Sequence, residues 1–229
     1  MSLSRLLQLA SPALPVGAYT YSQGLEWVVE AGTVTNEASA LRWIGDQLEW
    51  NLGRYEAPLL VRMMDAWKAG AGETALMLDA EYLATRETAE LRAETLQMGY
   101  SMQRLLNELG DFPAPLLDSI AVSPGQRSAS CGTFLYVWTC AAVAWLVPPQ
   151  EAITAWLWSW AENQTMAALK AVPLGQAAGQ RLLQEIGHRL PVVVDRALTL
   201  TGADYSNFAP GFAIACCNHE TQYTRLFRS

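Results

Sequence analysis

The densest group of residues able to bind a metal lies near the C-terminus, where Cys216, Cys217 and His219 precede Glu220. Thiolate and imidazole ligands suit nickel and zinc. The spacing matches no closed tetrahedral site, and the segment by itself supplies too few ligands for one. Cys216, Cys217 and His219 are therefore weak metal candidates, and transient contact with a metal, or a metal shared between two chains, stays open.

Residues typical of catalysis are sparse. The chain lacks the GxxxxGK[ST] loop, the HExxH motif and the GxSxG elbow. Of its two histidines, His188 lies in a helical pattern where a surface or capping role is expected. Glu26 and Glu30, one helical turn apart, could act as a general acid and base, but paired acids on a helix usually form a solvated face. We expect no catalytic residues, no enzyme activity and no stably bound cofactor.

Two cationic segments could bind a partner protein. Near the C-terminus, Arg225 and Arg228 alternate with Tyr223 and Phe227, and arginine and aromatic side chains carry much of the binding energy at protein contacts. The alternative is a solvated tail with incidental charges. The apolar side chains of this segment favour an interface, since they have no evident way to be buried alone.

Lys170 is the other cationic candidate, and no lysine follows it. It ends a charge-poor helical pattern shortly before Pro173, so its ordinary role would be to stabilise the last carbonyls of a helix.

The elements that position these residues are predicted to be helices, because no stretch shows convincing strand alternation. Apolar residues recur at helical spacing. The predicted helices cover residues 3–10, 35–52, 60–67, 73–84, 87–109, 128–150, 149–160 and 183–194. The expected fold is a single-domain, all-α helical bundle with kinked helices, in which 128–150 is the buried central helix.

Irregular segments interrupt this pattern. The apolar loop within residues 6–27 is expected to pack in or across the core, because prolines and glycines punctuate it. The prolines of 111–126 predict a connection, and Pro173 with Gly175 predicts a break. Periodicity fails after Thr201, so we expect an all-α domain over 1–200 and a conditionally ordered, partner-binding tail over 201–229.

Composition excludes several classes of protein. The net charge of -7 offers no basic stripe for nucleic acid. Four cysteines without a CxxC pair indicate a reduced, cytoplasmic protein. The longest apolar run, 134–147, is too short to span a membrane, and the N-terminus does not resemble a signal peptide. A hydrophobic content of 51% with 16% charged residues leaves apolar surface to cover, which favours a homodimer.

Several stretches resemble one known family. They are LASPALPVGAYTYSQGLEW (9–27), CGTF with its alanine-rich continuation (131–144), KAVPLGQ..GQRLL (170–183) and HETQYTRLFRS (219–229). All are similar to the urease accessory proteins called UreF. The resemblance implies an all-α homodimer without activity of its own that joins UreD (also called UreH) and the GTPase UreG into the complex that delivers nickel to apo-urease.

The resemblance also implies site residues. Lys170, Gln176 and Arg181 fall where the family meets UreG. The tail that carries Tyr223, Arg225, Phe227 and Arg228 falls where the family orders on UreD/UreH and helps to recruit UreG. GTP would be bound by UreG only, whose nucleotide state this protein would couple to nickel delivery.

One departure from the family pattern keeps a second hypothesis open. Cys216 and Cys217 replace the small residues or methionine expected before His219. A small all-α metal carrier or enzyme that uses Cys216, Cys217 and His219 is the alternative.

Overall fold

The computed structural model describes residues 3–110, 112–120 and 132–229, and within these residues every regular element is helical. The all-α, single-domain prediction is therefore confirmed. The first half of the chain forms α1 (Leu3–Ala10), η1 (Ala18–Thr20), α2 (Leu25–Glu30), α3 (Glu37–Gln47), η2 (Leu48–Glu56), α4 (Ala57–Lys68), α5 (Gly72–Ala84) and α6 (Ala89–Leu109). The second half forms α7 (Ala114–Ile120), α8 (Phe134–Ala144), α9 (Pro149–Ala171), α10 (Gln176–Thr199), η4 (Gly202–Asp204) and α11 (Pro210–Glu220).

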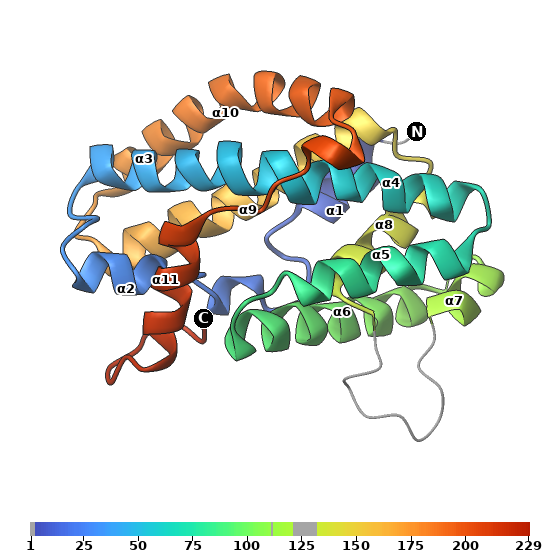
Figure 1. The fold of residues 1–229 in the computed structure, drawn as a ribbon, viewed down its shortest axis with the longest axis horizontal. Helices are drawn as coiled ribbons and strands as arrows, with labels where there is room; N and C mark the ends of the chain where they lie inside the picture. The colour runs from blue at the N-terminus through green and yellow to red at the C-terminus, as the bar shows by residue number, and fades with distance from the viewer. Residues whose placement is uncertain (1–2, 111, 121–131) are drawn as a thin grey trace.

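A continuous helical rod of α3, η2 and α4 crosses the molecule (Figure 1). Asn36 caps its start, close to the predicted start at residue 35: the Asn36 side chain accepts the Ser39 N–H, and Ser39 Oγ accepts the Asn36 N–H in return. The two separate helices expected here are joined by the π-helical η2. Gly53 lies within η2, where a Cβ would come within 2.5 Å of Val193 Cγ1 on α10. This close approach packs α10 along the rod.

Helix α9 lies at the centre of the fold, in contact with α10, α1, α2 and α4. Pro149 occupies its first turn, as predicted. The predicted break at Pro173 and Gly175 separates α9 from α10, and Pro191 lies inside α10. Helix α9 also contacts η1 of the N-terminal loop.

The predicted central helix is shorter than expected, because only α8 forms within it. Most of the α8 side chains are buried, and Thr133 caps the helix by accepting the Tyr136 N–H. Residues 128–131 of that prediction lie outside the described part of the chain. Gly99 of α6 lets α8 approach closely, since a Cβ there would be 2.2 Å from the Gly132 carbonyl oxygen.

The connection predicted over 111–126 contains a helix in its described part, α7. The preceding helix α6 ends at Gly110, whose positive φ of 70° fits the predicted stop. Residues 111 and 121–126 of this prediction are not described. Nowhere in the described ranges is a helix both long and apolar enough to cross a bilayer.

No helix was predicted after Thr201, yet residues 210–220 form α11. Its apolar residues surround the helix axis rather than forming one stripe, so periodicity could not reveal it. Phe212 and Cys216 are buried against Leu91 of α6, and Phe227 beyond the helix is buried as well. These contacts order the segment against its own chain; its partner-binding role stays a prediction.

Candidate functional site

The last nine residues, 221–229, form a segment that we call the C-terminal strap, and it closes against the loop between α1 and α2. The Ser229 carbonyl oxygen accepts the N–H groups of Ser22 (2.7 Å) and Gln23 (2.9 Å) and the Ser22 hydroxyl (2.6 Å). The Arg228 N–H donates to the Thr20 carbonyl at 2.8 Å. The two terminal segments singled out in the sequence therefore form one structural unit.

His219, at the end of α11, holds the base of the strap and is fully buried. Its Nδ1 lies 2.7 Å from Glu90 Oε2, and its Nε2 lies 3.3 Å from Glu26 Oε2. The ring thus lies between two carboxylates, with one nitrogen within hydrogen-bond distance of each. Arg225 also pairs with Glu90. Glu90 therefore connects α6 both to the end of α11 and to the strap.

Glu26 and Glu30, the pair considered for catalysis, lie in different environments. Glu26 is buried, and its oxygens accept the N–H groups of Leu226 (2.6 Å) and Phe227 (3.0 Å) in addition to the His219 contact. Glu30 is exposed. Glu26 therefore clamps the strap, and the two carboxylates form no acid–base pair.

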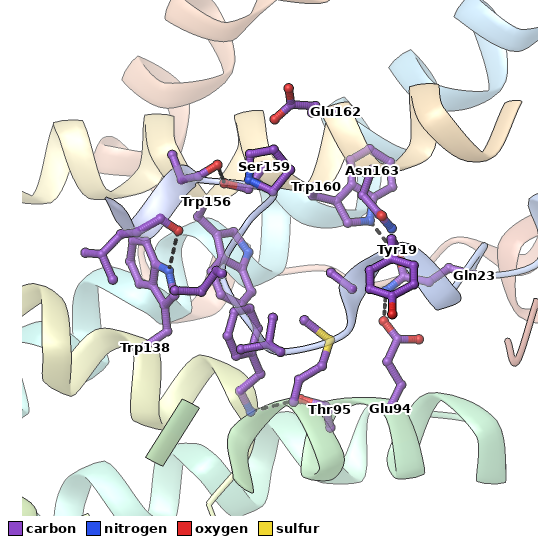
Figure 2. Close-up of a pocket in the computed structure, with 18 of the residues that line it drawn as sticks. Tyr19, Gln23, Glu94, Thr95, Trp138, Trp156, Ser159, Trp160, Glu162 and Asn163 are labelled. Carbon is purple, nitrogen blue, oxygen red and sulfur yellow. Dashed lines mark hydrogen bonds between the residues drawn. The ribbon is translucent and has the colours of Figure 1, made fainter. Parts of the chain in front are cut away.

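A second buried carboxylate, Glu94 of α6, fastens the end of the strap. Its oxygens accept the Gln23 amide (2.6 Å) and the Ser229 hydroxyl (2.7 Å). Burial raises the pKa of Glu94 to about 7, although these two hydrogen bonds oppose the shift. Gln23 also accepts the Trp160 indole N–H at 2.7 Å, so Gln23 links α9 to Glu94 of α6 (Figure 2). The Ser229 hydroxyl adds the strap to this network.

Beside this network lies a cavity of about 230 Å³ between α6, α8, α9 and the N-terminal loop (Figure 2). Its tryptophans have all donated their indole N–H groups: Trp138 to Leu9, Trp156 to Glu56 and Trp160 to the loop. What they present to the cavity is therefore apolar ring surface. The other lining residues include Tyr19, Tyr82, Arg86, Glu94, Met98, Phe134, Glu162, Asn163, Met166 and Lys170.

Lys170, in the last turn of α9, lies at this cavity and against the strap. Its Nζ is 6.0 Å from the centre of the Tyr19 ring and 5.5 Å from that of Phe227. Lys170 and Phe227 were predicted to serve two different partners, yet they are neighbours. The structure therefore joins the two predicted surfaces.

The other residues predicted with Lys170 lie on α10. Gln176 is exposed at the first position of this helix. Arg181 is exposed but paired with Glu37 of α3, through Nε to Oε1 at 2.8 Å and Nη2 to Oε2 at 2.5 Å. This ion pair raises the pKa of Arg181 and lowers that of Glu37. Arg181 is already occupied by a partner within its own chain.

The weak metal candidates are not brought together. Cys216 is buried, and desolvation raises the pKa of its thiol, whereas Cys217 is exposed. Both ring nitrogens of His219 face carboxylates. The described residues contain no cluster of three or more His, Cys, Asp or Glu side chains that could hold a metal. Tyr223 of the tail is fully exposed. His188, on α10, has the surface position expected for it.

Sequence reasoning missed the residues that fasten the strap. Glu90 and Glu94 lie in the predicted 87–109 helix but were not among the predicted site residues, yet Glu94 is only 7% exposed. Their partners Ser22, Gln23 and Ser229 are distant in sequence. The available signal was the four-residue spacing of the two glutamates, which places them on one face.

Comparisons with known proteins agree on one family. A family model described as UreF matches residues 34–187. A urease accessory protein UreF from Azoarcus sp. (strain BH72) is 57% identical over 233 residues, covering 100% of this chain and 96% of the relative. One from Dechloromonas aromatica (strain RCB) is 56% identical over 229 residues, covering 100% and 98%. The bifunctional urease accessory protein UreEF of Bordetella bronchiseptica is 45% identical, and the alignment covers 99% of this chain and 52% of that protein.

Proposed function

The chain belongs to the UreF family of urease accessory proteins, and from this premise we propose that it bridges UreD/UreH and the GTPase UreG in the complex that delivers nickel to apo-urease. As a urease accessory protein it is not an enzyme. Its task is to bring other proteins together, so its working parts are surfaces.

The contact between Lys170 and Phe227 carries this proposal. Lys170 is the residue that we assign to UreG, together with Gln176 and Arg181. Phe227 belongs to the strap that we assign to UreD/UreH, together with Tyr223, Arg225 and Arg228. Because the two sets meet at this contact, a partner that moves the strap changes the surroundings of Lys170. Such a junction suits a protein that couples the nucleotide state of UreG to the rest of the complex.

Nickel is proposed as cargo in transit. The tail cysteines and His219 do not converge on one point, which disfavours the alternative of a direct metal carrier. We propose that GTP is bound only by UreG, that the protein works in the cytoplasm, and that it forms a homodimer. Exposed leucines on α1, Leu3 and Leu7, support the dimer, since they leave apolar surface to cover.

Co-purification tests the bridge. Tagged protein is mixed with UreD and UreG homologues, separately and together, and the eluted complexes are measured by light scattering. The bridge predicts that UreG is retained with UreD only when this protein is present. A UreD–UreG complex of equal yield without it would overturn the proposal.

A further inference from the structure

The cationic side chains that we assign to partner contacts differ in the groups of their own chain that they contact. Arg181 is paired with Glu37, and Arg225 is paired with Glu90. Lys170 is exposed and lies over two aromatic rings, and no carboxylate of the described residues forms an ion pair with it. Aromatic faces attract a cation without taking its hydrogen bonds. The Lys170 ammonium therefore has N–H groups left to donate to another molecule.

Three chain segments fix the position of this ammonium. Lys170 itself lies in the last turn of α9, where the Val172 N–H donates to the Ala168 carbonyl at 2.8 Å and ends the helix. Phe227 is buried, and its N–H donates to Glu26 at 3.0 Å. One ring is thus anchored in the core while the cation remains at the surface.

The second ring, Tyr19, is held by a tight turn of the loop. Gly17 has a φ of 79°, a conformation that favours glycine, and its carbonyl accepts the N–H (3.1 Å) and the hydroxyl (2.9 Å) of Thr20. The strap holds the same turn through the Arg228 N–H. The backbone of Tyr19 is thus fixed, although the residue is 65% exposed.

We propose that Lys170, Tyr19 and Phe227 form a seat for a carboxylate of the partner protein, in which Tyr19 and Phe227 are positioning residues for the Lys170 ammonium. Charge complementarity identifies the group, because a carboxylate attracts and accepts hydrogen bonds from an ammonium that forms no ion pair within the described part of its own chain. Tyr19 and Met166, the latter one turn before Lys170 and 46% exposed, supply apolar surface around it. The partner is therefore a protein segment that presents an acidic side chain beside an apolar one.

This inference rests on the proposed UreG contact at Lys170, so its first test needs no partner. The protein has only two lysines, Lys68 and Lys170, and Lys68 lies beside Asp65 at 3.6 Å. With [¹³C]lysine labelling, the Lys170 ε-methylene signal is expected to be shifted upfield of the Lys68 signal by the ring currents. Tyr19→Leu should reduce this shift, and Tyr19→Phe should keep it. Coincident lysine signals in the wild-type protein would overturn the seat.

Binding to UreG is the second test. Tyr19→Leu should weaken binding by about two- to five-fold, the loss typical of an exposed cation–π contact, and Tyr19→Phe should restore it. Tyr100→Leu on α6, where the tyrosine is 39% exposed, is the matched control and should bind as wild type. Lys170→Met keeps the apolar stem and should weaken binding further, since it removes the charge. Unchanged affinity in Lys170→Met would exclude a carboxylate at this position.

The outcomes separate the two proposals. If Lys170→Glu abolishes UreG binding while Tyr19→Leu binds as wild type, the seat is wrong and the bridge stands. If Lys170→Glu binds UreG normally, the proposed UreG contact itself is wrong. The NMR result still reports whether Tyr19 positions the ammonium.

Discussion

Ser229 and Glu94 lie 135 positions apart in the chain, yet the Ser229 hydroxyl donates a 2.7 Å hydrogen bond to Glu94 Oε2 in the interior of the protein. This bond connects the end of the strap to α6, and Gln23 connects the same carboxylate to the N-terminal loop. Closure of the strap therefore depends on a buried ionisable group.

Glu94 should make stability depend on pH. Its ordinary pKa of 4.5 is raised to about 7, so the folded protein binds this proton more tightly than the unfolded chain does. The stability that Glu94 contributes is fully present below pH about 4.5 and is lost as the pH rises through about 7. The melting temperature should fall as the pH is raised from 5 to 8. In Glu94→Gln the melting temperature should depend less on pH. An unchanged slope in Glu94→Gln would contradict the assignment.

Asp79 should stabilise the folded protein by holding Thr133, the residue that caps α8. Its carboxylate accepts the Thr133 hydroxyl at 2.5 Å and the Thr133 N–H at 3.2 Å at the start of that helix. Asp79→Ala should lower the free energy of unfolding by about 2 kcal/mol, since it leaves these buried donors unpaired. Asp65→Ala on the exposed side of α4 is the control and should change it by less than about 0.5 kcal/mol. Urea denaturation measures the free energy of unfolding of both variants. Equal losses in Asp79→Ala and Asp65→Ala would refute the role of Asp79 in holding Thr133.

Removing the His219 ring should release the strap. His219→Gln takes away the side chain that lies between the Glu26 and Glu90 carboxylates, and leaving a buried polar group without its hydrogen-bond partner costs about 1–3 kcal/mol. Hydrogen exchange should then accelerate in residues 221–229 before the rest of the protein. His188→Gln, at an exposed position, should leave exchange unchanged. Full protection of the strap in His219→Gln would show that the cluster does not hold it.

Reversing the charge of Lys170 should abolish capture of UreG and leave the fold intact. The side chain is exposed, so Lys170→Glu should keep the melting temperature, while a like charge facing the partner's carboxylate costs a few kcal/mol of binding. Lys68→Glu is the matched control. Pull-down against UreG and UreD homologues measures the effect. Early melting, or loss of UreD together with UreG, would show a structural role instead.

Nickel binding distinguishes the bridge from the metal carrier. Cys217 is exposed but His219 is engaged on both ring nitrogens, so the tail cluster should not bind nickel tightly. Equilibrium dialysis of the isolated protein should give the same weak binding for the wild-type protein and for Cys217→Ser. Tight binding that disappears in Cys217→Ser would favour the carrier.

Local patterns in the sequence determined much of the helical architecture. The Asn36 cap, the stop at Gly110, the first-turn Pro149 and the break at Pro173 follow from backbone chemistry that acts within a few residues. The resemblance to the UreF family, by contrast, marked the two terminal motifs and Lys170. Periodicity could not predict α11, because its buried face includes a histidine and its apolar Ile214 lies exposed on another side, so its apolar residues form no single stripe.

Only the tertiary structure decided how these parts meet. Glu90 and Glu94 have the local pattern of a solvated helix face, and their burial follows from α11 and the strap, which pack on them from more than 100 residues away. Likewise, the sequence marked Lys170 and Phe227 but not their contact. Spacing along a helix fixes which residues share a face, whereas the partner of that face depends on the packing of the whole chain.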